Sequence, residues 1–376
     1  MSTDADIARR RKAVSGTRAA ALSSLALVLS ACANSPHGRL IDLTLKPDSP
    51  TWPAPPETAR YALVGELTGA ADFAAARGKL RSGAGRILRA IAGLAVGKRR
   101  YQELRRPVAG FTDADGSIFV ADMSLQGIAK FDMAQSKFSI WRNAARREAF
   151  VAPSAVISDG AGGVYVSDAE KGEVFRLNAE GDPVGRFGAG ILKRPLGLAR
   201  DPTDGAVFVA DSEDYKIKKF SADGDFLSAI GGAGQTAGAL NTPTYLAFSN
   251  GVLYVSDTFN FRVQEFDRDG RLLMQFGKNG DFVGAMARPK GVAVGGGGRI
   301  YVVESLFDRL LIFDDQGRLL MTLAGEGAKA RSFYLPSGVW TDETGRVYVA
   351  DMFNGRIVIY DELTPLAAEA SNANAQ

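Results

Sequence analysis

Cysteine and histidine are almost missing from this sequence, which has one of each among 376 residues. A structural zinc site takes several Cys or His ligands, and a disulfide takes two cysteines. The chain can therefore form neither a zinc site built from such ligands nor an internal disulfide. The sole histidine, His37, lies close to the N-terminus, which also excludes zinc chemistry that depends on several histidines.

An excess of charge of either sign is missing as well. The formal net charge is +3, and residues 1–31 account for all of it with five basic residues against two acidic ones. The remainder of the chain is neutral. Nucleic-acid binding requires a basic surface on the folded protein, so we expect no nucleic-acid partner.

The N-terminus also has no apolar run long enough to cross a bilayer, which takes ~20 residues. Residues 19–31 are thirteen uncharged residues rich in Leu and Ala, and they follow Arg9, Arg10, Arg11, Lys12 and Arg18. A cationic segment followed by a short apolar one is typical of a signal peptide. We predict a signal peptide over residues 1–31 and an exported protein.

The end of this segment, Leu29-Ser30-Ala31-Cys32, resembles the lipobox of bacterial lipoproteins. The resemblance implies that Cys32 becomes the lipidated N-terminus, and Ala33 after it implies the outer membrane, facing the periplasm, in a Gram-negative host. The alternative is a plain secretory leader with a chance cysteine. Residues 32–60 hold six of the fifteen prolines and are predicted to be a stiff tether.

The rest of the chain repeats with a period of about 46 residues. Each copy opens with a proline, namely Pro107, Pro153, Pro195, Pro243, Pro289 and Pro336, and has a second strand that ends in Asp122, Asp168, Asp211, Asp257, Glu304 or Asp351. Alternating β-branched and aromatic residues between Gly and Asp turns indicate strands. Four strands per copy and six copies over residues 107–362 predict an all-β, six-bladed β-propeller of four-stranded antiparallel blades.

The segment from Pro336 to Ile357, with Gly-Arg-Val-Tyr-Val-Ala-Asp before Asn354 and Arg356, resembles the NHL repeat. The run Trp-Pro-Ala-Pro-Pro-Glu at residues 52–57 resembles the start of bacterial lipoproteins of this repeat class. The resemblance to the NHL repeat implies a six-bladed propeller. The sixth copy has only three strands, and Tyr61–Leu67 (YALVGEL) has the pattern of a fourth. We predict that this N-terminal strand closes the last blade and that residues 363–376 are a disordered tail.

Residues 68–106 have no strand pattern and contain ten basic residues against two acidic ones. Apolar residues recur within them at helical spacing beside two arginines. The candidate helix consists of Arg86, Ile87, Leu88, Arg89, Ile91 and Leu94. It is interpreted either as a brace packed on the propeller or as a basic amphipathic helix that docks on a membrane or a partner.

The six acids that end the second strands could form a ring around the channel, and a central calcium ion would need such a ring. The structural interpretation is that each acid caps its own turn and pairs with the basic residue five places on, namely Lys216, Arg262, Arg309 or Arg356. Because a motif repeated in every blade is typical of structure, we expect no cofactor and no catalytic residues here.

The loops after these acids differ in composition between blades. Blades 4, 5, 6 and 1 carry a predicted apolar crescent: Phe259, Phe261, Leu306, Phe307, Met352, Phe353, Met123 and Leu125. Blades 2 and 3 carry Glu170, Lys171, Glu213 and Asp214 instead. A contiguous apolar surface marks a contact site for a protein or peptide, whereas the alternative is that most of these side chains pack between blades.

Together these features predict a binding protein more than an enzyme. We expect a lipid-anchored scaffold or sensor of the bacterial envelope that binds envelope proteins or peptides with one propeller face. The alternative is a metal-assisted hydrolase or lactonase with a small-molecule site in the central channel.

Overall fold

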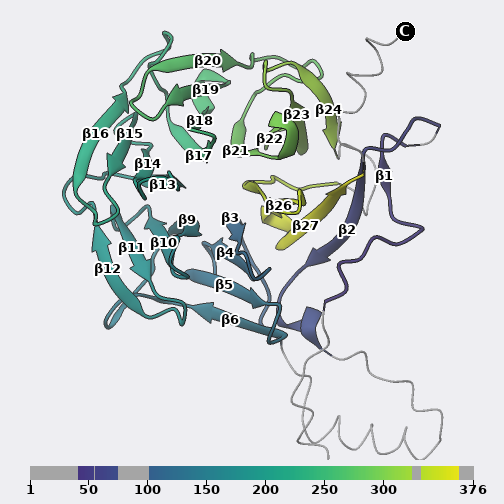
Figure 1. The fold of residues 1–376 in the computed structure, drawn as a ribbon, viewed down its shortest axis with the longest axis horizontal. Helices are drawn as coiled ribbons and strands as arrows, with labels where there is room; N and C mark the ends of the chain where they lie inside the picture. The colour runs from purple at the N-terminus through teal and green to yellow at the C-terminus, as the bar shows by residue number, and fades with distance from the viewer. Residues whose placement is uncertain (1–40, 55, 75–100, 324–331, 364–376) are drawn as a thin grey trace, which may run out of the picture.

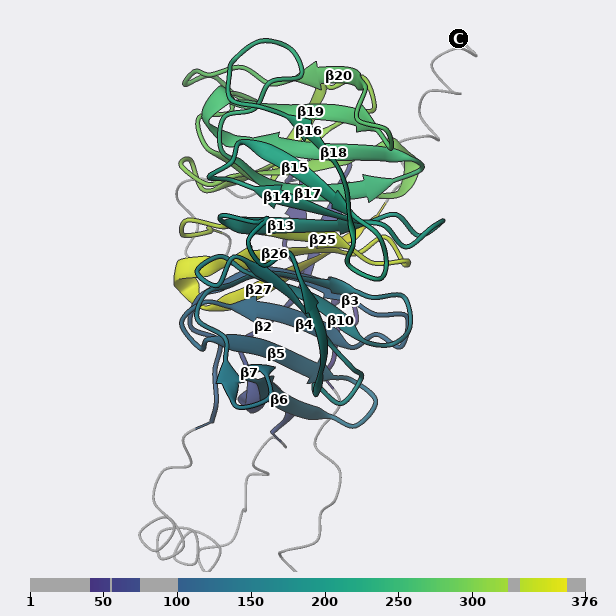
Figure 2. The same cartoon turned by 90° about the vertical axis from the view of Figure 1, so that its left-hand side faces the viewer.

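The computed structural model describes residues 41–54, 56–74, 101–323 and 332–363. Six antiparallel sheets stand around a central axis like the blades of a propeller (Figure 1), and the side view shows that the disc is one blade thick (Figure 2). The predicted fold class is confirmed. Several predicted features lie outside the described residues. They are the signal peptide over residues 1–31, the lipidation site Cys32, the sole histidine His37, the tail from residue 364, and the candidate helix of Arg86, Ile87, Leu88, Arg89, Ile91 and Leu94.

The strands follow one order in every blade, from the channel outward. Blade 1 contains β3(Pro107–Thr112), β4(Ile118–Asp122), β5(Gly127–Asp132) and β6(Lys137–Trp141). Blade 2 contains β9(Pro153–Ser158), β10(Val164–Asp168), β11(Glu173–Leu177) and β12(Pro183–Phe187). Blade 3 contains β13(Pro195–Arg200), β14(Val207–Asp211), β15(Lys216–Phe220) and β16(Phe226–Gly231).

The other three blades repeat this arrangement. Blade 4 contains β17(Pro243–Ser249), β18(Val252–Asp257), β19(Arg262–Asp267) and β20(Leu272–Phe276). Blade 5 contains β21(Pro289–Val294), β22(Ile300–Glu304), β23(Arg309–Phe313) and β24(Leu319–Leu323). Blade 6 contains β25(Val339–Thr341), β26(Val347–Asp351), β27(Arg356–Glu362), β2(Tyr61–Leu67) and the outermost β1(Thr51–Trp52).

Proline starts five of the six inner strands, and each of these prolines is paired with the acid that ends the second strand, as in Pro289 with Glu304. Proline has no N–H to donate, so it suits the first residue of a strand. Five of the six second strands are buried from end to end between the neighbouring blades, and in β18 only Val252 and Tyr254 are half-buried. Six buried clusters fill the spaces between blades.

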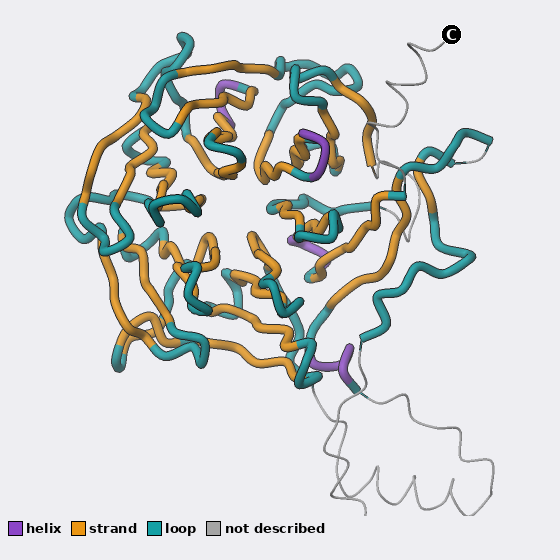
Figure 3. The backbone as a smooth tube through the Cα atoms, viewed as in Figure 1, coloured by secondary structure: helices purple, strands orange, loops and turns teal. Residues whose placement is uncertain are grey.

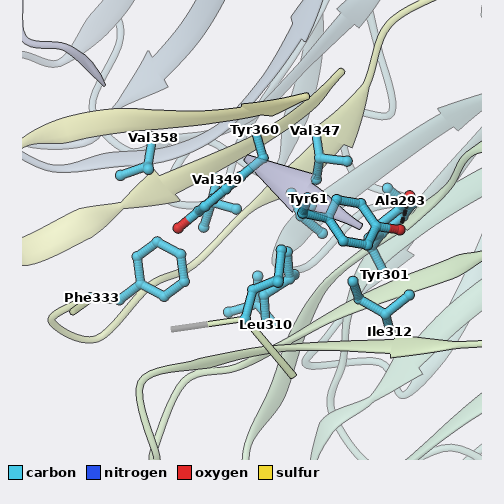
Figure 4. Close-up of a cluster of buried hydrophobic side chains, with 13 residues drawn as sticks. Tyr61, Ala293, Tyr301, Leu310, Ile312, Phe333, Val347, Val349, Val358 and Tyr360 are labelled. Atoms are coloured by element: carbon cyan, nitrogen blue, oxygen red, sulfur yellow. Dashed lines mark hydrogen bonds between the residues drawn. The ribbon is translucent and has the colours of Figure 1, made fainter. Parts of the chain in front are cut away.

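The predicted closure by Tyr61–Leu67 is confirmed. β2 pairs antiparallel with β27, with Leu67 opposite Ile357, so no unpaired edge remains between the first and last parts of the repeat. Tyr61 is fully buried in the cluster between blades 5 and 6, and its hydroxyl lies 3.1 Å from that of Tyr301 (Figure 4). Near the other end of the strand, Glu66 Oε1 accepts from Arg356 Nη1 at 2.8 Å.

Short elements interrupt this pattern. β7(Asn143–Ala145) and β8(Glu148–Ala149) form a small hairpin between blades 1 and 2, and η1(Ala70–Phe73) packs beside β6. The other helical turns, η2(Thr258–Asn260), η3(Gly296–Gly298) and η4(Met352–Asn354), connect strands within blades 4, 5 and 6 (Figure 3). None of the described helices has the length and apolar character needed to cross a membrane.

Candidate functional site

The six predicted acids lie at one end of the propeller, here called the acid face, and all six side chains are buried. Each accepts backbone N–H groups from the loop that enters its own blade. Asp168 accepts from the amides of Val151 at 2.7 Å and Ala152 at 3.0 Å, and Asp122 accepts from those of Arg105 and Arg106 at 2.7 and 3.0 Å. The carboxylates therefore fasten loops to strands, which is the structural interpretation of the repeat.

Two of the four predicted ion pairs form. Arg262 Nε lies 2.9 Å from Asp257 Oδ2, and Arg356 Nε lies 2.7 Å from Asp351 Oδ2. Burial nevertheless raises the pKa of Asp257 above its usual range, against the lowering effect of its hydrogen bonds and of Arg262. These two acids are thus engaged within their blades.

The other two predicted pairs are wrong. Asp211 is taken by Lys218, whose Nζ lies 2.7 Å away, because Lys218 shares a strand face with Lys216 and is the more buried of the two. Lys216 faces Asp214 at 3.7 Å instead. In blade 5, Arg309 lies over an aromatic ring of the adjacent loop.

Tyr245 closes the channel from the inner strand of blade 4. Its hydroxyl donates to the carbonyl of Val108 in blade 1 at 2.9 Å and also hydrogen-bonds Ser337 Oγ in blade 6. Blades 4 and 1 are opposite each other in the ring (Figure 1), so the side chain spans the axis. Burial raises the pKa of this phenol to about 12, and it stays neutral at physiological pH.

The repeat makes room for this tyrosine. The equivalent third residues of the other inner segments are Ala109, Ala155, Gly197, Gly291 and Gly338. A Cβ on Gly291 would lie 2.5 Å from the backbone N of Val339, so only glycine allows the neighbouring inner strands to come so close. Five small residues around the axis leave the space that one large ring fills.

A cavity of about 380 Å³ lies on the far side of Tyr245 from the acid face. Its walls are the later residues of all six inner segments, and they include Phe111, Phe248 and Trp340 with Arg200 as the one charged residue among the described lining. Within the part of the chain that the structure describes, no three His, Cys, Asp or Glu side chains gather in a way that could hold a metal ion.

The predicted crescent is only partly exposed. Phe259, Leu306 and Phe353 are 49%, 52% and 48% exposed. Phe261, Phe307, Met123 and Leu125 are half-buried, and Phe307 lies under the Arg309 guanidinium at 5.6 Å. The prediction is wrong for Met352, which is buried and packs in the cluster between blades 1 and 2 that contains Val108.

Three exposed apolar side chains that the sequence analysis missed extend the same surface. Phe282, Val283 and Tyr334 lie in loops that run from the outer strand of one blade to the next blade on the acid face. The Tyr334 ring contacts that of Phe353, with centroids 5.4 Å apart. We call the six exposed apolar residues that blades 4–6 and their connecting loops present on the acid face the apolar rim: Phe259, Phe282, Val283, Leu306, Tyr334 and Phe353.

Ion pairs cover blades 2 and 3 on the same face. Lys171 bonds Glu148 at 2.6 Å, and Arg194 bonds Glu170 at 3.1 Å. Hydrogen bonds from Lys193 and Lys218 lower the pKa of Asp214 to about 2. Apolar residues are present here too, namely Val151, Ile191 and Tyr215, but they are interspersed with paired charges. The acid face therefore has an apolar half and a salt-bridged half.

Comparison with known proteins shows the fold and no closer relationship. No family model and no curated protein matches this sequence. Solved structures similar to it include a gluconolactonase from Xanthomonas campestris (TM-score 0.53, 19% identity, 69% of this chain and 85% of that chain). A second is an auxiliary nutrient binding protein from Bacteroides thetaiotaomicron VPI-5482 (TM-score 0.52, 14% identity, 69% and 70%). A third is a streptogramin B lyase (TM-score 0.51, 13% identity, 69% and 94%). The chain is a six-bladed β-propeller.

Proposed function

We propose that this chain is a binding protein whose acid face, over blades 4–6, receives a protein or peptide partner. The observation that carries the proposal is the apolar rim, six exposed apolar side chains on the loops of adjacent blades, while ion pairs occupy the other half of the face. Contiguous exposed apolar surface rimmed by charges is a feature of interaction sites. Aromatic residues are also the usual anchors of such contacts.

The proposal also covers the localisation of the protein. The signal-peptide pattern and Cys32 after Leu29-Ser30-Ala31 support export and a lipid anchor, so the partner is an envelope protein or peptide, and the outer membrane facing the periplasm is the favoured site. The blade pattern in the segment from Pro336 to Ile357 supports assignment of the repeats to the NHL type. Metabolic labelling with a fatty acid in the wild-type protein and in Cys32→Ser tests the anchor.

A triple substitution tests the binding face. Phe259→Ser, Leu306→Ser and Phe353→Ser remove three exposed side chains of the rim, and we expect loss of partner capture from envelope extracts with an unchanged melting temperature. The matched control replaces three equally exposed apolar residues of the outer strands, Val184, Leu227 and Leu320, with Ser. Equal capture by both triple variants would overturn the proposal, and collapse of the rim variant alone would assign these residues to the core.

The alternative function is a small-molecule site in the channel, as in a hydrolase or lactonase. The cavity of about 380 Å³ beyond Tyr245 is the observation that favours it, since ligand sites are concave and mostly apolar. The described lining has no carboxylate or imidazole, so a metal-assisted reaction does not fit the residues present there. A calcium-dependent rise in melting temperature of the purified protein would contradict that conclusion about the lining and would favour the metal-assisted alternative.

A further inference from the structure

One charged side chain lies where the inner strands enter the channel from the acid face. The six residues that follow the blade-opening prolines are Val108, Ser154, Leu196, Thr244, Lys290 and Ser337, and only Lys290 is charged. Its two neighbours in this ring already have hydrogen-bond partners: Thr244 bonds Thr258 at 2.6 Å, and Ser337 bonds the Tyr245 hydroxyl. Tyr245 forms the floor beneath the ring.

Lys290 lies among like charges. Burial, together with the like charges of Arg288 and Arg106, lowers its pKa to about 8. Among the residues that the structure describes, no carboxylate forms an ion pair with any of these three side chains. We call Lys290, Arg288 and Arg106 the cationic mouth.

The acids next to the cationic mouth are occupied by backbone groups. Both oxygens of Glu304 lie 2.9 Å from the amide of Arg288, and one also accepts from that of Leu306 at 3.0 Å. Asp308 accepts from the amide of Leu335 at 2.7 Å. These acids hold the loops in place and do not pair with the cationic side chains.

The cationic mouth is continuous with the apolar rim. The guanidinium of Arg106 lies 5.4 Å from the centre of the Phe353 ring, which in turn contacts Tyr334. The backbone amides of Leu306 and Arg288 both donate to Glu304 Oε1, which places these two residues side by side. On the other half of the face, Lys171, Arg194 and Lys218 have carboxylate partners, whereas the cationic mouth lies beside exposed rings of the apolar rim.

We propose that the cationic mouth binds the carboxylate of an acidic side chain in a peptide segment whose apolar side chains pack on the apolar rim. The inference rests on the proposed function and names the chemistry of its partner. A partly buried cation without a counter-ion costs free energy, and a carboxylate would relieve that cost through charge-assisted hydrogen bonds. Flanking apolar residues would supply the affinity, and the carboxylate would set the register.

A peptide selection tests this directly. A random dodecapeptide library displayed on phage is selected on the immobilised full chain. We expect enriched sequences that combine Asp or Glu with neighbouring aromatic or Leu residues. Against Lys290→Met, the acidic enrichment should disappear while the apolar enrichment remains. Against the rim variant with Ser at 259, 306 and 353, the apolar enrichment should disappear.

The affinity of one synthetic peptide from the enriched set then gives the magnitude. We expect Lys290→Met to weaken binding by about tenfold or more, and replacement of the peptide's acid by its amide to have the same effect. The matched control is Lys278→Met, which removes an exposed charge of the same face outside the cationic mouth, and we expect a change of about twofold or less. Circular dichroism verifies that each variant is folded.

The outcomes separate this inference from the proposed function. Peptides enriched only in apolar residues, or acidic enrichment that survives in Lys290→Met, would overturn the inference and leave the binding face intact. Absence of any rim-dependent peptide would overturn both. Sedimentation with vesicles of phosphatidylcholine, with and without phosphatidylglycerol, identifies the other anionic partner: Lys290-dependent binding to the anionic vesicles alone would replace the peptide by a membrane.

Discussion

Substitution of Lys290 by Met should make the protein more stable near neutral pH. Methionine has a similar length and an unbranched, apolar chain, so it fills the same space without the charge. In the folded protein the ammonium is partly buried beside Arg288 and Arg106, and the pKa falls from 10.5 to about 8. The native state therefore bears a cost for keeping Lys290 charged.

The size and pH dependence of this cost follow from the pKa. Each pH unit of pKa change corresponds to 1.36 kcal/mol, and partial exposure of the side chain reduces the effect, so we expect a gain of about 1–3 kcal/mol in the free energy of unfolding. Below pH 8 the lysine is charged in both states and the gain is full. Between pH 8 and 10.5 the lysine loses its proton in the folded state before it does so in the unfolded state. The gain then shrinks toward the difference in apolar packing between methionine and neutral lysine.

Urea unfolding at pH 7 and at pH 10, for the wild type and Lys290→Met, measures this difference. A gain at pH 7 that is mostly lost at pH 10 agrees with the reasoning. Arg288→Gln should diminish the gain, because one of the two like charges is gone. A gain of equal size at both pH values, or a destabilised variant, would refute the claim that an uncompensated charge lies at the channel mouth.

Three further predictions concern the body of the propeller. Glu265 is buried in blade 4, one of its oxygens has no hydrogen-bond partner among the described residues, and burial raises its pKa to about 7. Ionisation of this carboxyl therefore costs the native state free energy only above pH 4.5. In urea unfolding, Glu265→Gln should add about 1–3 kcal/mol of stability at pH 8 and nothing below pH 4.5. Tyr245→Phe should cost about 1 kcal/mol, since the carbonyl of Val108 loses its donor, and an unchanged unfolding midpoint would contradict the cross-channel bond. Glu66→Gln should weaken the half-exposed ion pair with Arg356 by about 0.2–1 kcal/mol and so speed amide hydrogen exchange in Tyr61–Leu67. High salt should abolish the difference between variant and wild type. Unchanged exchange at low salt would show that this ion pair does not stabilise the closing strand.

The fold could be predicted because its signals are local and repeated. The prolines, the acids that end the second strands and the alternation in Tyr61–Leu67 each fix a strand, and six copies reinforce one another. The closing strand could be found by counting, because blade 6 has only three strands of its own after Pro336. The hairpin of β7 and β8 was missed because it occurs in one blade only.

The site could be predicted only in part. The composition of a loop does not tell which way a side chain points: Met352 turns into the core, whereas its neighbour Phe353 stays exposed. Phe282 and Tyr334 lie in connecting loops of variable length that repeat alignment does not compare. Tyr245 could have been found from the sequence, because it is the one large residue at a position where the other five blades have Gly or Ala.

The most direct test of the binding face is site-specific photo-crosslinking in the native envelope. A benzoylphenylalanine residue replaces Leu306 on the apolar rim or Leu320 on the outer strand of the same blade, and both side chains are exposed. We expect discrete crosslinked products from position 306, none from position 320, and loss of these products when Phe259 and Phe353 are also changed to Ser. Identical products from both positions, or products only from position 320, would contradict it.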